Sequence, residues 1–367
     1  MSEKKLTKWQ FISIGVFFMM GTILHTSFVS AIAGRDAWLI PIMGFVMFLP
    51  TLIFCWRIGN MFPNTGLYEI NELVFGNIGG RIVTFLYFLF FLNVATLNHV
   101  EMSAFSATYL LRGTPIVVCG IMIVMAAVYA IKKGIITVGR ASGALVILML
   151  VLNAISFIQA IPQMDIDFTA PAMVQSPGVY ARSSHISSTI MYGEGLALMV
   201  FAGRTGKKVN MGKSMLIIML IAMVYMIQIH LREVLLLGPL VQFTRLPSLE
   251  AARMTGKSDT VSRTESIYSL IMLLCSLFRV LISFFVSLSA LRKVFRLKTY
   301  QALVVPMAAF IAAYSLYALE SPEDSYFYAV NTTPFIWALF TFVLPMFTLV
   351  IAVIKRKAKL PDRGGAV

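Results

Sequence analysis

Residues 189–198 read TIMYGEGLAL and place a carboxylate between two glycines inside a stretch that is otherwise apolar. Each glycine weakens a helix by about 1 kcal/mol relative to alanine. A buried acidic side chain is costly unless it has a partner. We therefore expect a break in a membrane helix at this point, with Glu194 lying beside backbone groups that the break sets free.

The chain around this stretch has the composition of an integral membrane protein. It has 367 residues, of which 59% are hydrophobic and 13% are charged, and its mean hydropathy is +0.84. Soluble domains usually contain about 25% charged residues. Apolar runs long enough to cross a membrane, about 20 residues, recur from residue 10 almost to the end. We expect an all-α membrane protein in which residues 1–367 form a single integral membrane domain.

Ten hydrophobic spans are expected, which suggests an internal repeat of five plus five. The two longest connections, 58–79 and 237–263, follow the second and the seventh span, and each is expected to hold a short interfacial helix. An odd number of spans per half gives the two halves, about 10–160 and 182–354, opposite orientations, as in inverted-repeat transporters. The expected spans are 10–33, 37–57, 80–110, 114–131, 135–160, 182–202, 211–236, 264–290, 300–319 and 330–354.

The distribution of basic residues predicts the topology. The formal net charge is +14, but Lys and Arg occur in short clusters between apolar runs, so we expect no nucleic-acid partner. With a cytoplasmic N-terminus, 21 Lys and Arg lie on the cytoplasmic side and eight outside, which places both termini in the cytoplasm. The N-terminus resembles a signal peptide closing at Ala31-Ile32-Ala33, but the apolar stretch is unusually long, and we expect it to be retained.

The first and sixth spans are counterparts, and both contain glycine near the middle. Paired interruptions of this kind indicate the midplane site of a transporter, where unwound backbone binds the substrate. The alternative is that the glycines allow close helix packing. That alternative does not account for Glu194. The candidate ligand-binding residues of the two segments are Gly21, Thr22, His25, Tyr192, Gly193, Glu194 and Gly195.

Two further charges are expected deep in the membrane, Glu101 and Arg279, and Asn98 lies one helical turn before Glu101. A charge at the centre of a membrane helix costs about 2.5–3.5 kcal/mol, so we expect these side chains to be paired or to face a cavity. Two acids and one base leave one net negative charge, so either Arg279 pairs with one glutamate while the other binds a ligand, or the second glutamate is protonated. We expect Glu101 to be the partner of Arg279 and Glu194 to be left for a ligand amine. The alternative for Glu101 is that its long span lets the carboxylate reach the membrane surface.

Nothing in the sequence supports an enzyme. The three cysteines have no CxxC spacing, the four histidines form no metal motif, and no phosphate-binding or nucleophile-elbow motif is present. We expect no cofactor, no metal and no catalytic residue. An intramembrane enzyme is the least supported of the functions considered.

Several motifs in a fixed order resemble the B subunits of bacterial spore germinant receptors, a family of the amino acid–polyamine–organocation transporter superfamily. The resemblance covers nearly the whole chain. The motifs are LTKWQFISI, GRDAWL, LLRGTPIVV, YGEGLALMVF, LPSLEAA with SRTES, and a basic C-terminal tail. One departure is that no proline follows the glycine-rich part of the first span before Arg35, so the ligand could differ from the family's usual amino acids.

The resemblance implies a LeuT-like fold of ten helices with helices 1 and 6 broken around a small-molecule site. It also implies a nutrient-sensing subunit in the spore inner membrane. The implied partners are a larger membrane A-type subunit and a C-type lipoprotein. The implied ligand is a germinant, which in this family is usually an amino acid. A secondary-active amino acid permease, proton-coupled through Glu101 or Glu194, remains an alternative because a sensor and a transporter can share one fold.

Overall fold

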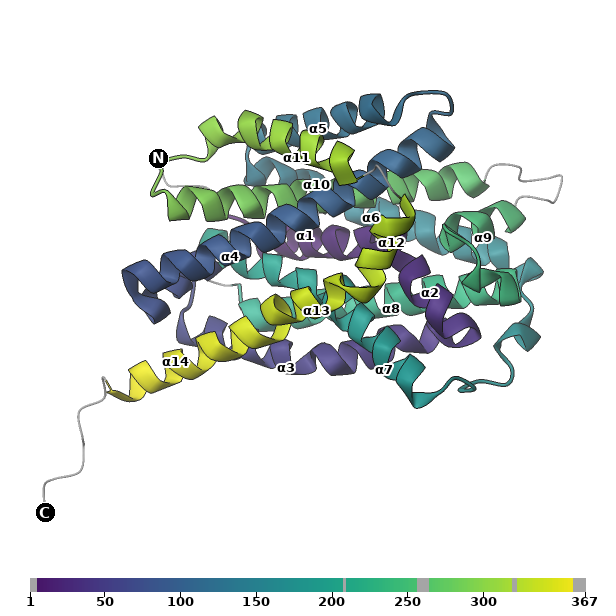
Figure 1. Cartoon of the computed structure of the whole chain (residues 1–367), viewed down its shortest axis with the longest axis horizontal. Helices are drawn as coiled ribbons and strands as arrows, with labels where there is room; N and C mark the ends of the chain where they lie inside the picture. Colours follow the sequence, from purple (N-terminus) through teal and green to yellow (C-terminus); the bar gives the residue numbers. More distant parts are fainter. Residues whose placement is uncertain (1–4, 207–208, 256–263, 319–321, 359–367) are drawn as a thin grey trace, which may run out of the picture.

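The computed structural model describes residues 5–206, 209–255, 264–318 and 322–358, and this part of the chain is all-helical apart from loops and one isolated bridge between Leu6 and Thr205 (Figure 1). The helices are α1 Lys8–Met20, α2 Thr26–Ala33, α3 Ile40–Met61, α4 Leu67–Phe105, α5 Ile116–Lys133, α6 Ile135–Ala160, α7 Pro177–Ile186, α8 Met211–Leu237, α9 Pro247–Thr255, α10 Thr264–Val294, α11 Val304–Ala318, α12 Pro322–Asn331, α13 Thr333–Ala338 and α14 Leu344–Ala358.

Shorter helical segments of 3₁₀ or π type connect many of these helices. Three of them, η3, η6 and η10, are π-helical. The segments are η1 Gly21–His25, η2 Gly34–Leu39, η3 Ser106–Leu110, η4 Ile161–Gln163, η5 Ile166–Thr169, η6 Ser187–Tyr192, η7 Gly193–Arg204, η8 Gly238–Gln242, η9 Gln301–Leu303 and η10 Leu339–Val343.

The expectation of a membrane protein is confirmed. In the described residues, eight helical stretches are long and apolar enough to cross a membrane. The expected spans 10–33 and 37–57 lie in one 54-residue stretch, Lys8–Met61, and the expected span 300–319 holds only the shorter apolar helix Gln301–Tyr317. Parts of the SRTES motif and of the basic tail lie outside the described residues.

The first expected span changes helix type where glycine enters it. A capping box between Thr7 and Gln10 starts α1, since each side chain bonds to the other residue's backbone. The α-helix gives way to the 3₁₀ segment η1 at Gly21, and α2 then resumes. Gly21 keeps right-handed helical dihedrals, φ −62° and ψ −11°. The expected interruption is therefore present as a change of helix type, without the unwound backbone that the sequence suggests.

The sixth expected span shows the same behaviour over a longer stretch. After α7, the chain forms the π segment η6 and then the 3₁₀ segment η7, which begins at Gly193. Gly193 has φ −62° and ψ −34°, so the backbone stays helical here too. Pure α geometry is nonetheless lost for 18 residues, from Ser187 to Arg204. Non-α turns of this kind free carbonyl groups and are frequent at functional sites.

The interrupted segments form the centre of the molecule. The apolar window within Pro177–Arg204 is 94% buried, whereas that within Ile135–Gln163 is only 28% buried. The described side chains from Phe11 to Ser30 are almost all buried. α1 packs against α6, α8 and α10, while α4 and α10 make the most extensive helix contact in the described residues. The exposed apolar faces of the outer helices suit contact with lipid.

Both long connections contain short helices, as expected. Leu67 begins the first of these, which runs on into the rest of α4 although Gly76 kinks the chain with φ 78° and ψ −177°. This positive φ is readily available only to glycine. The second connection forms η8 and α9. The face of α9 that carries Leu249 and Ala252 is buried against the protein, so α9 is a packed element of the fold.

Contacts between connections group them at opposite ends of the molecule. At one end, the amide of Leu6 donates to the carbonyl of Arg204 at 2.9 Å, and Glu72 pairs with Lys293. At the other end, Asp36 accepts hydrogen bonds from the amide of Met173 at 3.0 Å and from the hydroxyl of Tyr180 at 2.6 Å. Each contact joins segments that the predicted topology places on the same side of the membrane.

Candidate ligand-binding cavity

A cavity of about 600 Å³ lies between α2, α4, the centre of the sixth span, η8 and α12 to α13. Four of the ten predicted site residues line it: His25, Asn98, Glu101 and Glu194. The other six do not line it. Exposed residues of the connection after η8, including Phe243 and Arg245, line the cavity as well, so it reaches the surface beside this connection.

Glu101 and His25 form the polar wall of the cavity. Nε2 of His25 contacts Oε2 of Glu101. The imidazole is almost completely buried at 4% side-chain exposure, whereas the Glu101 side chain is 27% exposed. The His25 ring also stacks on Phe28, with ring centroids 5.2 Å apart, and this contact holds its orientation. His25 holds one oxygen of the Glu101 carboxylate, and the partly exposed side chain leaves the other oxygen available to a cationic ligand group.

Arg279 pairs with Glu194, and the predicted Glu101–Arg279 pair is wrong. Nη2 of Arg279 lies 2.7 Å from Oε1 of Glu194, and both side chains are completely buried. The other oxygen of Glu194, Oε2, has no hydrogen-bond donor among the described residues. The orientation of η7 about its axis points Glu194 toward α10. The sequence alone does not specify this orientation. Glu194 therefore both compensates Arg279 and contributes to the cavity wall.

Arg279 also joins the two interrupted spans. Nη1 donates to the hydroxyl of Thr22 in η1 at 2.7 Å, and Nη2 donates to the carbonyl of Ile190 in η6 at 3.3 Å. The Thr22 hydroxyl in turn donates to the carbonyl of Met19. Because 3₁₀ and π segments leave carbonyls outside the regular i to i−4 ladder, a guanidinium with several donors can satisfy them. Thr22 and Arg279 thus support the site from behind the cavity.

The predicted glycines lie at close helix contacts. A Cβ atom added to Gly21 would lie 2.7 Å from Cβ of Arg279, and one added to Gly193 would lie 3.0 Å from Cγ2 of Thr341. One added to Gly195 would collide with the end of the Met219 side chain. The sequence suggests that a larger residue at Gly193 or Gly195 acts mainly on the ligand. Overpacking usually costs about 1–3 kcal/mol, so at Gly193 the first effect of a larger residue is on stability. At Gly195 the contact is with the flexible end of the Met219 side chain, which can shift.

Two more predicted residues have local structural partners. The hydroxyl of Tyr192 donates to the carbonyl of Pro41 at 2.9 Å, and the ring lies against Phe45 and Phe48 of α3, so Tyr192 is a packing residue outside the cavity. Asn98 lines the cavity, although its amide nitrogen donates to the carbonyl of Val94 at 2.7 Å within α4. Its side-chain carbonyl is the part left for a ligand.

A second buried polar cluster is missed by reasoning from the sequence. The count of basic residues places Arg232 outside the membrane and gives Glu233 no role, yet both side chains are completely buried in α8. Glu233 accepts hydrogen bonds from the hydroxyls of Ser30, at 3.2 Å, and Ser248. The guanidinium of Arg232 stacks over the ring of Tyr268 at 3.7 Å. Adjacent opposite charges in the apolar run HLREVLLL are the signal that could have revealed this cluster.

The buried cluster holds α9 in place beside the cavity. Nη2 of Arg232 donates to the carbonyl of Ser248, the second residue of α9, at 2.9 Å. The Ser248 hydroxyl also lies 3.4 Å from the hydroxyl of Thr26 at the start of α2. The connection that borders the cavity, 242–246, ends at this helix. Its position therefore depends on buried hydrogen bonds to α2 and α8.

Comparison with known proteins decides the family. Residues 5–322 match the sequence profile described as Spore germination protein. The chain belongs to this family. A relative within the spore germination proteins, Spore germination protein KB of Bacillus subtilis (strain 168), is 22% identical over 359 residues, a match that covers 96% of each chain. The resemblance seen in the sequence motifs is confirmed.

This spore germination protein shares its fold with transporters of known structure. A manganese transporter of Eremococcus coleocola, crystallised with an aromatic bis-isothiourea substituted compound, matches with a TM-score of 0.59 and 10% identity over 95% of this chain and 79% of its own. A mutant of that transporter matches with a TM-score of 0.56, also at 10% identity, over 95% and 84% of the two chains. At this identity the match shows a transporter-like fold alone.

Proposed function

We propose that this protein is a germinant receptor subunit that binds a small nutrient carrying an amino group in the cavity beside Glu101. The observation that carries the proposal is the 600 Å³ cavity in a spore germination family member, lined by the partly exposed carboxylate of Glu101, with the buried Glu194 also part of its lining. Its size falls within the usual range for small-molecule sites, about 300–1,000 Å³. An amino acid, with its ammonium group near Glu101, is the ligand class that fits best.

The predicted site residues take two roles in this proposal. His25, Asn98, Glu101 and Glu194 face the ligand, because they line the cavity. The remaining residues hold the interrupted helices together behind it and do not contact the ligand. These framework residues are Gly21, Thr22, Tyr192, Gly193, Gly195 and Arg279.

We propose that the chain crosses the membrane ten times, in two halves of five crossings each. Dividing the 54-residue stretch Lys8–Met61 at Gly34, which has a φ of 57°, gives two crossings in place of one. Counting the shorter helix Gln301–Tyr317 gives the tenth. The paired interruptions at η1 and η6–η7 then fall in the first helix of each half, about 10–160 and 182–354, of one domain spanning 1–367.

Both termini are proposed to be cytoplasmic, with the cavity opening outward beside the connection 242–246. The excess of Lys and Arg in the connections grouped with the N-terminus supports this orientation. The membrane is proposed to be the spore inner membrane, where an A-type membrane subunit and a C-type lipoprotein would receive the conformational signal. Membership of the spore germination family supports the proposal of such partners.

Impermeant thiol labelling tests the topology. The three native cysteines are buried, so they give a low background. We expect Asp165→Cys to be labelled in intact cells and Asn64→Cys to be labelled only after the membrane is opened, because the two positions lie in connections of opposite predicted sides. Labelling of Asn64→Cys in intact cells together with protection of Asp165→Cys would contradict the orientation.

Glu101→Gln tests the ligand site. We expect the germinant response of spores to fall at least about tenfold with the protein still present, since a hydrogen bond to a charged group contributes about 1.5–3 kcal/mol. The amide keeps the side-chain volume, and the partly exposed position limits the effect on folding. The measurement is germination across a panel of amino acids, sugars, nucleosides and salts, with protein quantified by blotting.

The matched control is Glu265→Gln, which removes an exposed carboxylate outside the cavity. Its response should stay within about twofold of the parent. If Glu101→Gln spores respond normally, the ammonium site beside Glu101 is refuted.

A secondary-active amino acid permease is the second candidate, because the matching solved structures are transporters. Uptake of labelled amino acid by purified protein in vesicles distinguishes the two functions. Accumulation would favour the permease, whereas binding without accumulation would favour the receptor. The described residues bring together no group of three or more His, Cys, Asp or Glu side chains suited to a metal ion, so manganese does not enter either proposal.

A further inference from the structure

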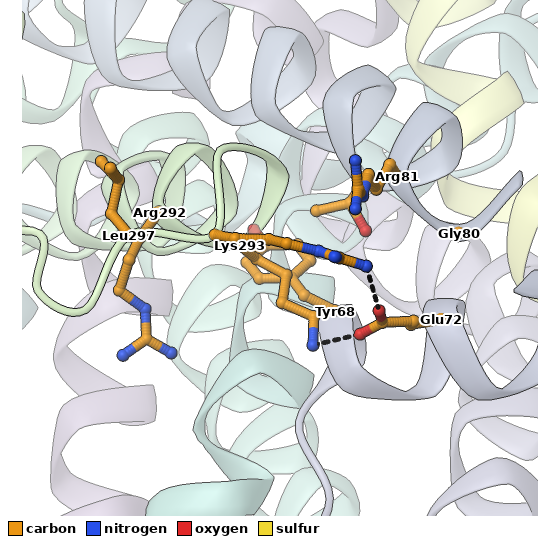
Figure 2. A pocket seen from close by; sticks show the side chains of 9 residues that line it. Tyr68, Glu72, Gly80, Arg81, Arg292, Lys293 and Leu297 are labelled. Carbon is orange, nitrogen blue, oxygen red and sulfur yellow. Dashed lines mark ion pairs between the residues drawn. The ribbon is translucent and has the colours of Figure 1, made fainter. Parts of the chain in front are cut away.

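A second pocket lies at the end of the molecule opposite the ligand cavity. It has a volume of about 240 Å³ and lies between the start of α4 and the end of α10 (Figure 2). Four basic side chains line it, Arg81, Arg292, Lys293 and Arg296, with a single acidic one, Glu72. The walls therefore carry a clear excess of positive charge. Nothing in the proposed function uses this pocket.

The single carboxylate is already compensated. Glu72 contacts Nζ of Lys293, and Nη2 of Arg296 lies 3.8 Å from its other oxygen, as the dashed lines of Figure 2 indicate. Arg81 and Arg292 make no ion pair within the part of the chain that the structure describes. Nε of Arg81 is buried and has no hydrogen-bond partner among those residues. A buried donor without a partner is costly, so Nε of Arg81 is a donor that an anionic group in the pocket would satisfy.

Exposed apolar side chains occur in the lining of the pocket and in the segment of α4 that contributes Arg81 to it. Leu297 lines the pocket and is 40% exposed, and Ile82, next to Arg81, is 58% exposed. Ile78, just after the kink at Gly76, is 77% exposed. Exposed apolar side chains beside a basic pocket suit a ligand whose charged group enters the pocket while its hydrocarbon part stays in the bilayer. A free anion would gain nothing from them.

We propose that this pocket binds the phosphate of an anionic phospholipid headgroup from the leaflet at this end of the molecule. One water takes about 30 Å³ of liquid volume, so the pocket has room for a phosphate group with water around it. Arginine matches phosphate oxygens with paired donors. Basic pockets between membrane helices are a known form of headgroup site. By joining α4 to α10, a bound lipid would stabilise the two helices whose packing is most extensive in the fold.

The test measures lipid binding to the full-length protein, purified in detergent, by native mass spectrometry. The probes are dioleoyl phosphatidylglycerol, dioleoyl phosphatidylcholine and inorganic phosphate. We expect phosphatidylglycerol to bind at least about tenfold more tightly than phosphatidylcholine. Removing two basic residues with Arg81→Gln and Arg296→Gln should weaken phosphatidylglycerol binding about 25-fold, since each basic residue near an anionic surface contributes about 1 kcal/mol, or about fivefold.

Two further variants keep the result interpretable. Lys132→Gln with Lys133→Gln removes two basic residues from the end of α5, outside the pocket, and should change binding less than about twofold. Arg81→Lys keeps the charge and should retain the preference for phosphatidylglycerol, which guards against a folding defect in the glutamine variant.

Equal binding of the two lipids would overturn the proposal, as would an unchanged double variant or an equal loss in the α5 control. Displacement of phosphatidylglycerol by inorganic phosphate at the same concentration would identify the ligand as a free anion and would also overturn the lipid assignment.

Discussion

Arg279→Ala is expected to remove most of the protein from the membrane. The guanidinium is completely buried and lies 2.7 Å from Glu194, which is buried as well. Removing one partner of a buried ion pair costs about 3–5 kcal/mol, because the other charge is left uncompensated. Folded domains have only about 5–15 kcal/mol of stability. Arg279→Ala also removes the donor that links Thr22 to Ile190. Quantitative blotting of membranes measures the effect.

A double variant identifies the partner. Arg279→Ala combined with Glu194→Gln leaves no uncompensated charge, so protein level should recover relative to Arg279→Ala alone. Combination with Glu101→Gln should give no recovery, because Glu101 contacts His25. Arg253→Ala serves as the control: its pairs with Glu250 and Glu265 are partly exposed, and such pairs contribute about 0–1 kcal/mol. Recovery with Glu101→Gln and none with Glu194→Gln would show that the pairing differs from this structure.

The observed pairing also revises the expectation for Glu194→Gln. The sequence alone predicts a weaker ligand response with the protein still present. The structure adds a structural role, because the amide would leave Arg279 buried without its counter-charge. We therefore expect Glu194→Gln to lower protein level as well as response.

Glu233→Ala is the second change with a large expected effect. The carboxylate is completely buried, accepts from Ser30 and Ser248, and lies 3.3 Å from Nδ1 of His230. Its loss leaves these donors without an acceptor, and each hydrogen bond to a charged group contributes about 1.5–3 kcal/mol. We expect the purified protein to unfold at a markedly lower temperature, with a loss of roughly 3 kcal/mol or more in the free energy of unfolding. Thermal unfolding followed by tryptophan fluorescence measures the change.

Glu250→Ala is the matched control for this prediction, since it removes a carboxylate from α9 that is 37% exposed and paired with Arg253. Surface pairs contribute little, so its unfolding temperature should stay close to that of the parent. Equal stability of the Glu233 and Glu250 variants would mean that the buried cluster does not hold α9. Loss of stability in both would indicate that α9 itself is the sensitive element.

Much of the architecture could be predicted because it depends on local composition. Apolar runs of membrane length identify an all-helical membrane protein whatever their partners are, since backbone groups in lipid must bond within the helix. The interruptions near Gly21 and Gly193 were also visible, because they arise from the residues at those positions. The form of these interruptions could not be predicted. The sequence suggested unwound backbone, but both segments stay helical, as 3₁₀ and π turns, because neighbouring helices pack against them.

The sequence by itself determined that this protein spans a membrane, where its helices are interrupted and that Glu101, Glu194 and Arg279 lie within its apolar spans. Only the tertiary structure decided that Arg279 pairs with Glu194, that Glu101 turns to His25 and that Arg232 is buried. Hydropathy and helix propensity depend on neighbours along the chain. The partner of a buried charge depends instead on the rotation and depth of helices distant in sequence, which many side-chain contacts fix together.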